Sequence, residues 1–154
     1  MKLIDAINEV DDLKPNMYQL PEKIKWLSRL DKRIFEQILL THVLSEEEKE
    51  PFLPEDEEEE EGRVFWIGIP PWRRRKPEKL VFNGYTEEDT DKELIVGEPY
   101  DELYVHWLEA QIDWNNMEYA SFNNTNAMFE SVYKAFRNAF NQTHRPKGRI
   151  NTYF

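Results

Sequence analysis

The amino-acid sequence predicts a mainly α-helical protein, a small helical bundle with a long central helix and an inserted acidic loop or β-hairpin arm. Two observations predict the bundle. No proline or glycine interrupts the chain between Pro99 and Pro146, and aromatic residues recur there at helical spacing. A third observation, a dense acidic run followed by a basic run near the middle of the chain, predicts the inserted arm.

Two helices are predicted in the N-terminal part. The spacing of Ile4, Ile7 and Val10 predicts a helix over about residues 2–13, which the Lys-Pro-Asn sequence at 14–16 ends. Pro21 suits the first turn of a second helix that runs to about Leu40, since a proline there loses no helical hydrogen bond.

The segment after Pro99 predicts the central helix. On a helical wheel its apolar residues form two neighbouring stripes: Tyr100, Leu103, Trp107, Ala110, Trp114 and Met117, then Tyr104, Leu108, Ile112 and Tyr119. A helix that is apolar on two sides is buried on both. We therefore expect the indoles of Trp107 and Trp114 to be buried.

A further helix is predicted from the apolar residues between Met128 and Phe140. The asparagine-rich residues 123–126 favour a break or kink in front of it, because asparagine is a weak helix former and a good N-cap. One continuous helix is the alternative. Arg145, Pro146 and Gly148 are expected to end the helix.

The arm is predicted over residues 45–98. Residues 46–62 hold eleven acidic residues and one lysine, and such a run is expected to lack fixed structure in the isolated subunit. Residues 64–69 and 80–82 have the composition of strands and predict a hairpin, and residues 93–96 are a candidate short strand. We expect one domain over residues 1–154, with 45–98 as the arm and 144–154 as a C-terminal tail.

Composition restricts the function. The net charge is -11, which argues against a general nucleic-acid binder because phosphate contacts need clustered cations. The chain has no cysteine, so it has neither disulfides nor thiolate chemistry. It shows no apolar run of membrane-spanning length and no secretory leader, so we expect a cytoplasmic protein that does not enter a membrane.

No sequence motif for chemistry is present. The phosphate-binding loop, the dinucleotide fingerprint, the nucleophile elbow and the zinc-protease motif are all missing, and the chain has three histidines. We therefore predict that the protein is not an enzyme and holds no cofactor. Glu102, His106, Glu109 and Asp113 share one helix face that could hold a metal, but a solvated or interface face is the favoured interpretation, so no metal site is predicted.

Two segments are the candidate interface. The basic run beside two tryptophans could contact phosphate, pair with the acidic residues 55–61 of a neighbouring chain, or stay a solvated loop. The tail is basic and ends in apolar residues, so we expect it to dock on another subunit or on a partner protein; a frayed terminus is the alternative. Deleting residues 145–154 is expected to leave the monomer's stability nearly unchanged. The candidate interface residues are Trp66, Trp72, Arg73, Arg74, Arg75, Arg145, Lys147, Arg149, Tyr153 and Phe154.

Three parts of the chain together resemble a known group of proteins. They read DAINEVDDLKPN (5–16) with EKIKWLSRLD (22–31), ELIVGEPYDELYVHWLEAQIDWNNMEYASFNNTNAMF (93–129), and NQTHRPKG (141–148). They are similar to small proteins encoded near the capsid genes of phages and prophages of Gram-positive bacteria, which resemble the head–tail connectors, or neck adaptors, of tailed phages. The acidic run and the WRRRKP sequence at 72–77 match no pattern of that family.

The resemblance implies a structural virion protein. It would form a homo-oligomeric ring, commonly of twelve copies, that docks to the portal protein, receives tail or neck-completion proteins and continues the DNA channel. Double-stranded DNA would pass without specific binding, and the protein would be found in the virion neck, or in the host cytoplasm during assembly. The alternative function is an acidic regulatory protein that mimics DNA and inhibits a nuclease or repressor.

Overall fold

The computed structural model describes residues 1–54 and 79–148. The chain forms two compact units, the first made of Met1–Val43 and Asn83–Phe154 and the second of Leu44–Phe82. The predicted strand at 64–69, the acidic residues 55–61 and the end of the tail lie outside the described residues.

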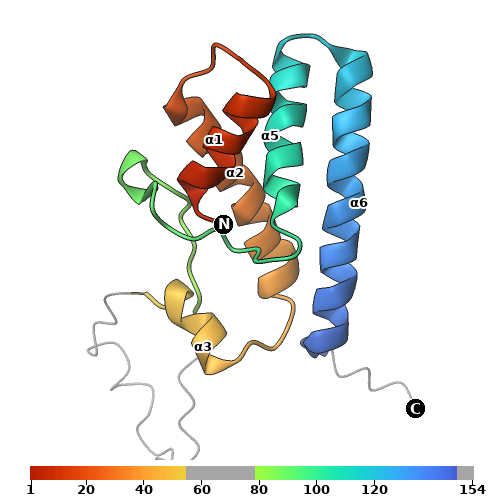
Figure 1. Ribbon diagram of the computed structural model, residues 1–154. Helices are drawn as coiled ribbons and strands as arrows, with labels where there is room; N and C mark the ends of the chain where they lie inside the picture. The colour runs from red at the N-terminus through yellow and green to blue at the C-terminus, as the bar shows by residue number, and fades with distance from the viewer. Residues whose placement is uncertain (55–78, 149–154) are drawn as a thin grey trace, which may run out of the picture. The chain divides into compact units, whose positions relative to one another are not determined.

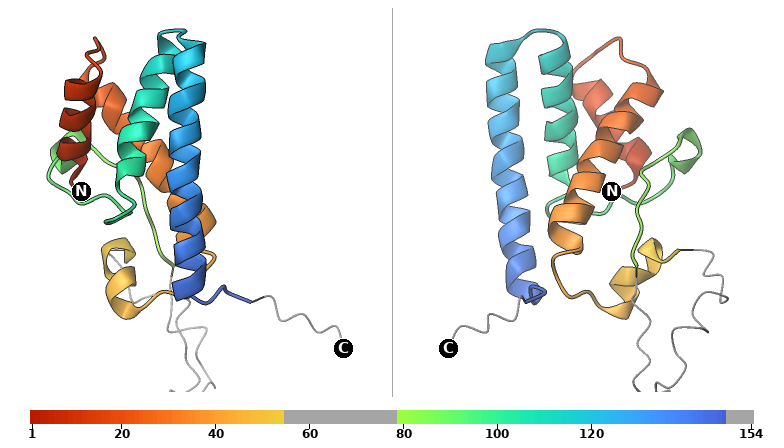
Figure 2. Two further views of the ribbon diagram at one scale, coloured as in Figure 1. Left: turned by 45° about the vertical axis from the view of Figure 1, so that its right-hand side comes forward. Right: turned by 180° about the vertical axis from the view of Figure 1, so that it is seen from behind.

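The first unit is a helical bundle (Figure 1). Its helices are α1 (Leu3–Leu13), α2 (Leu20–Ile34), α5 (Glu102–Asn115) and α6 (Tyr119–Thr143). Helix α5 packs against all three others, with α6 on one side and α1 and α2 on the other (Figure 2). The mainly helical bundle and the central position of α5 are thereby confirmed.

The first two helices follow the predicted pattern closely. Helix α1 buries Leu3, Ala6, Ile7 and Val10. Pro21 lies in the first turn of α2, which a π-helical turn at Phe35–Leu39 extends to within one residue of the predicted end. The apolar face of each helix therefore fixes its orientation in the bundle.

The break after the central helix lies earlier than predicted. Helix α6 runs without interruption through residues 123–126, and the chain instead turns at residues 116–118, where Met117 has a positive φ of 60°. The hydroxyl of Thr125 is buried and donates to Asp113, which holds this part of α6 against α5. As a result the central helix is the shorter of the two, with 14 residues, and the long helix is the peripheral α6, with 25.

The early turn corrects the burial predicted for Trp114. Its side chain is 54% exposed, whereas Trp107 is half-buried, donates from Nε1 to the carbonyl oxygen of Trp26 at 3.0 Å and packs on Phe129. Trp114 is the penultimate residue of α5. The predicted apolar stripe therefore extends beyond the end of the helix, and its last residues lie at the surface.

The second unit contains the start of the arm. Helix α3 (Glu46–Lys49) continues into a 3₁₀ turn at Glu50–Phe52, and Ser45 and Glu48 close the helix with a reciprocal capping box. The expectation that residues 46–52 lack structure is therefore wrong. The ring of Phe52 packs on that of Phe82, with centroids 6.0 Å apart, and the N–H of Val81 donates to the carbonyl of Phe52.

Of the predicted β-hairpin, residues 64–69 lie outside the described residues, and residues 80–82 form no strand. Two isolated bridges are the β-pairing within residues 1–54 and 79–148, Lys2 with Glu93 and His42 with Pro146. Residues 93–96 form no strand of their own, but their neighbours tie the N-terminus down, because the N–H groups of Leu3 and Leu94 donate to the carbonyls of Lys92 and Met1. A 3₁₀ turn at Glu87–Asp89 precedes this pairing. None of the helices in these ranges is long and apolar enough to cross a bilayer.

Candidate functional site

A group of apolar side chains lies exposed at one end of the first unit, and we call it the apolar tip. Both the α1–α2 loop and the α5–α6 turn lie at that end (Figure 1). The exposed fractions run from 53% to 94% for the members of the apolar tip: Leu13, Met17, Trp114, Met117 and Tyr119. Exposed apolar patches are typical of protein interaction sites, so the apolar tip is a candidate binding surface.

The apolar tip has a fixed aromatic base. The ring of Trp114 packs on Tyr119 and Phe122, with centroids 5.4 and 5.1 Å apart. The hydroxyl of Tyr18 donates to Asn116 Oδ1 at 2.8 Å and joins the two loops. An aromatic surface held in this way suits an anchor residue of a partner, because little conformational freedom is lost on binding.

A buried carboxylate holds this end of the bundle together. Asp113 is fully buried and forms an ion pair with Lys14, while the hydroxyls of Ser121 and Thr125 donate to its Oδ2 at 2.9 and 3.0 Å. The cluster therefore joins α5 and α6 to the residue that follows α1. A charge buried inside protein needs such partners, since an unpaired one is strongly destabilising.

A second carboxylate anchors the loop before α5. Asp31 of α2 is fully buried and accepts hydrogen bonds from the hydroxyls of Tyr85 and Tyr104, the latter at 2.6 Å, and from the N–H of Ile95. Burial raises the pKa of Asp31 to about 6, because its effect outweighs that of the hydrogen bonds, which lower the pKa. Burial and the Asp31 charge also raise the pKa of Tyr85 and of Tyr104 well above the usual tyrosine value.

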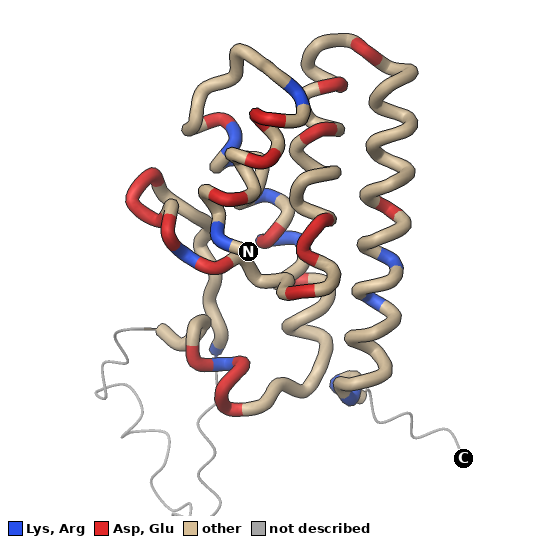
Figure 3. Tube along the Cα trace, viewed as in Figure 1, with Lys and Arg blue, Asp and Glu red and all other residues tan. Residues whose placement is uncertain are grey.

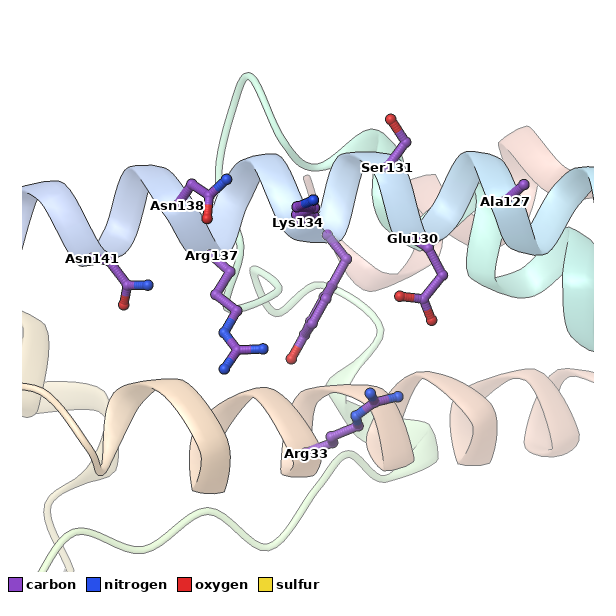
Figure 4. Close-up of a pocket in the computed structure, with 9 residues that line it drawn as sticks. Arg33, Ala127, Glu130, Ser131, Lys134, Arg137, Asn138 and Asn141 are labelled. Carbon is purple, nitrogen blue, oxygen red and sulfur yellow. The ribbon is translucent and has the colours of Figure 1, made fainter.

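A cationic groove runs between α2 and the C-terminal half of α6 (Figure 4). It encloses about 640 Å³, and the charged residues that line it are Arg33, Lys134, Arg137 and Glu130. Arg33 lies over the ring of Tyr133, 5.4 Å from its centroid. Three cations against one carboxylate suit an anionic partner, although the chain as a whole has a net charge of -11.

The charges are unevenly distributed along the helices. Figure 3 shows acidic residues along α1 and the loop before α5, whereas the two cations of α6 lie in its C-terminal half. The exposed acids nearest the apolar tip in sequence are Asp12 and Glu118. The end that carries the apolar tip is therefore acidic, and the opposite half of α6 is basic.

The tail begins at the far end of α6 from the apolar tip. Arg145 and Lys147 are exposed, but their backbones are held, because Val43 N–H donates to the Arg145 carbonyl at 2.7 Å and Lys147 N–H donates to Thr41 at 2.8 Å. Beside them, the Nε2 of His42 lies 2.7 Å from the Asn141 side chain. The backbone is thus held in place as far as residue 147.

The helix face weighed as a metal site separates into different environments. Asp113 is buried among the partners described above, Glu102 is exposed, and His106 Nδ1 lies 4.0 Å from Glu109 Oε1. In the part of the chain with described structure, no group of three or more potential ligands could hold a metal ion.

Most of the predicted interface residues lie outside the described ranges. These are Trp66, Trp72, Arg73, Arg74, Arg75, Arg149, Tyr153 and Phe154. Arg145 and Lys147 are the two that lie within them. The sequence reasoning missed the apolar tip and the cationic groove. Lys134 and Arg137, spaced three residues apart on one helix, were the available signal for the groove.

Comparisons with protein-family models, with curated proteins and with solved structures give no match to this chain.

Proposed function

We propose that this chain is a structural virion protein of a tailed bacteriophage, a ring-forming head–tail connector that docks to the portal and joins the capsid to the tail. The resemblance of residues 5–16, 22–31, 93–129 and 141–148 to connector proteins supports the proposal. Those segments contain both buried carboxylates, Asp31 and Asp113, and most of the groups that bind them. The similar residues are thus the ones that hold the bundle together.

The apolar tip is the structural observation that carries the proposal. A small acidic protein that worked as an isolated monomer would have little reason to expose Met17, Trp114 and Met117 on one end. A ring protomer needs such a surface, together with a different one for the next protomer. The tail and the cationic groove offer surfaces of opposite charge to the acidic end.

The charge of the chain also suits a DNA channel. A net charge of -11 would keep phosphates from adhering to the ring, so that DNA slides through it. The rival function, a DNA-mimic inhibitor, uses acidity in the opposite way, as a ligand for a basic protein. A mimic would act as a monomer or small oligomer and needs no apolar surface at one end.

Mass photometry of the purified full chain, alone and with DNA-filled capsids that carry a portal, tests the proposal. The connector proposal predicts a closed particle of many 18.6-kDa subunits, or one that appears on addition of the capsids. A chain that stays single under both conditions contradicts the proposal. Tight binding to a basic DNA-binding protein in the same sample would favour the inhibitor instead.

A further inference from the structure

We propose that the apolar tip binds residues 149–154 of a second copy of this chain, so that copies join head to tail. The inference rests on the proposed self-assembly and names the surfaces that would carry it. The two surfaces match in chemistry. The segment RINTYF supplies Arg149 and three apolar residues, and the apolar tip supplies an aromatic base beside the exposed acids Asp12 and Glu118.

A chain cannot place these residues on its own apolar tip. The tail is held at Lys147 by its hydrogen bond to Thr41, at the far end of α6. Helix α6 has 25 residues, which at about 1.5 Å per residue separate its two ends by about 37 Å. Residues 148–154, fully extended at about 3.5 Å each, reach about 25 Å.

Because the tail is too short to reach the apolar tip of its own chain, the contact is assigned to another copy. The remaining gap is about 12 Å at Phe154 and about 30 Å at Arg149, so the segment as a whole cannot lie on the apolar tip of its own chain. Releasing the tail would require breaking its pairing with residues 41–43, where Val43 and Thr41 bind Arg145 and Lys147. The length of α6 places no such limit on the tail of a second copy, because that copy can bind in any position relative to the first.

The contact has the symmetry that a ring requires. The apolar tip and the tail are different surfaces at opposite ends of α6, so the contact between copies is heterologous. Contacts of this kind close into rings when the rotation between neighbours allows it. Tyr153 and Phe154 would provide the aromatic anchors, and Arg149 would meet Asp12 or Glu118 at the rim.

Cysteine cross-linking in the full chain tests the contact, since the natural sequence has no cysteine. A Met117→Cys variant is mixed with a Phe154→Cys variant, assembled and mildly oxidised, and disulfide-linked pairs are measured on a non-reducing gel. Met128→Cys mixed with Phe154→Cys is the matched control, because Met128 is 51% exposed but lies nine residues along the chain from Tyr119. We expect at least about tenfold more linked pairs with Met117→Cys, since thiols must come within bonding distance.

Each result has a distinct meaning. An assembled particle without the 117–154 link overturns this inference and leaves the connector proposal standing. A chain that never self-associates overturns both. A disulfide formed inside a single chain that carries both substitutions also overturns the inference, because it shows that the tail reaches its own apolar tip.

A charge substitution gives a second measurement. Met117→Asp is expected to raise the concentration for half-assembly by about tenfold or more, because it places a charge in the apolar contact. The melting temperature of the Met117→Asp monomer is expected to stay unchanged, since aspartate tolerates a positive φ. Met128→Asp is expected to leave assembly unchanged. Equal assembly of the two variants contradicts the proposed contact.

Discussion

Asp31 gives the bundle a pH dependence that can be measured. Its pKa is raised to about 6 in the folded chain by burial, above the ordinary value of 3.8 for an unfolded aspartate. The folded state therefore binds the proton more tightly than the unfolded state between these two values. By linkage, the stability contributed by this group is greatest below the unfolded pKa of 3.8, is lost as the pH rises through the folded pKa of about 6, and no longer changes above about pH 7.

Replacing Asp31 with asparagine should remove this dependence. Between pH 4 and pH 7 the free energy of unfolding of the natural chain, measured against Asp31→Asn, is expected to fall by about 2.4 kcal/mol, most of the roughly 3 kcal/mol that corresponds to the whole pKa difference. Urea unfolding at both pH values gives the difference and cancels the contribution of the other carboxylates. A difference that does not change with pH would show that Asp31 titrates normally.

The two tryptophans of α5 should respond very differently to truncation. Trp107→Ala is expected to cost about 3 kcal/mol, because it removes a packed ring and the hydrogen bond from its Nε1 to the Trp26 carbonyl. Trp114→Ala is expected to cost less than about 1 kcal/mol, since more than half of that side chain is exposed. Equal losses in urea unfolding would contradict the position of Trp114 at the surface.

At the scale of the elements, periodicity predicted the helices, and the end that it misplaced is the turn between α5 and α6. The apolar spacing in α1 and α2 fixed both helices to within a few residues, since Pro15 and Pro21 punctuate them. The α5–α6 turn escaped prediction because its residues, Asn116 to Glu118, contain neither glycine nor proline. The three asparagines and one threonine of residues 123–126 gave a stronger but misleading signal.

The left-handed residue in that turn leads to a prediction about stability. Met117 has a φ of 60°, a conformation that costs a side-chain-bearing residue about 1 kcal/mol and costs glycine nothing. Met117→Gly is therefore expected to raise the free energy of unfolding of the monomer by about 0.5–1 kcal/mol. Met128→Gly, inside α6, should lower it by about 1 kcal/mol. Thermal melting of the two variants checks the opposite signs.

The candidate site could be predicted only in part, because its contacts join distant parts of the chain. Asp31 and Tyr104 are 73 residues apart, and Lys14 and Asp113 are 99 apart. Helical periodicity relates residues three or four positions apart and cannot pair these groups. Asp113 was therefore placed on a polar face, although the fold buries it completely.

At the scale of the whole molecule, the tail has two parts: residues up to 147 are hydrogen-bonded to the bundle, and residues 149–154 are the proposed contact with another copy. Removing residues 145–154, as the sequence alone suggested, would also remove the pairing of Arg145 and Lys147 with residues 41–43. That deletion should therefore destabilise the monomer, whereas deletion of 149–154 should leave it intact. Only the shorter deletion separates an effect on assembly from an effect on folding.

Electron microscopy of particles made without this chain tests the connector proposal most directly. The connector proposal requires that a phage or prophage encodes the chain, and removal of its gene there should give capsids without tails. Adding back the purified full chain should restore tail joining. Tailed, infectious particles in normal numbers without the chain would contradict the proposal.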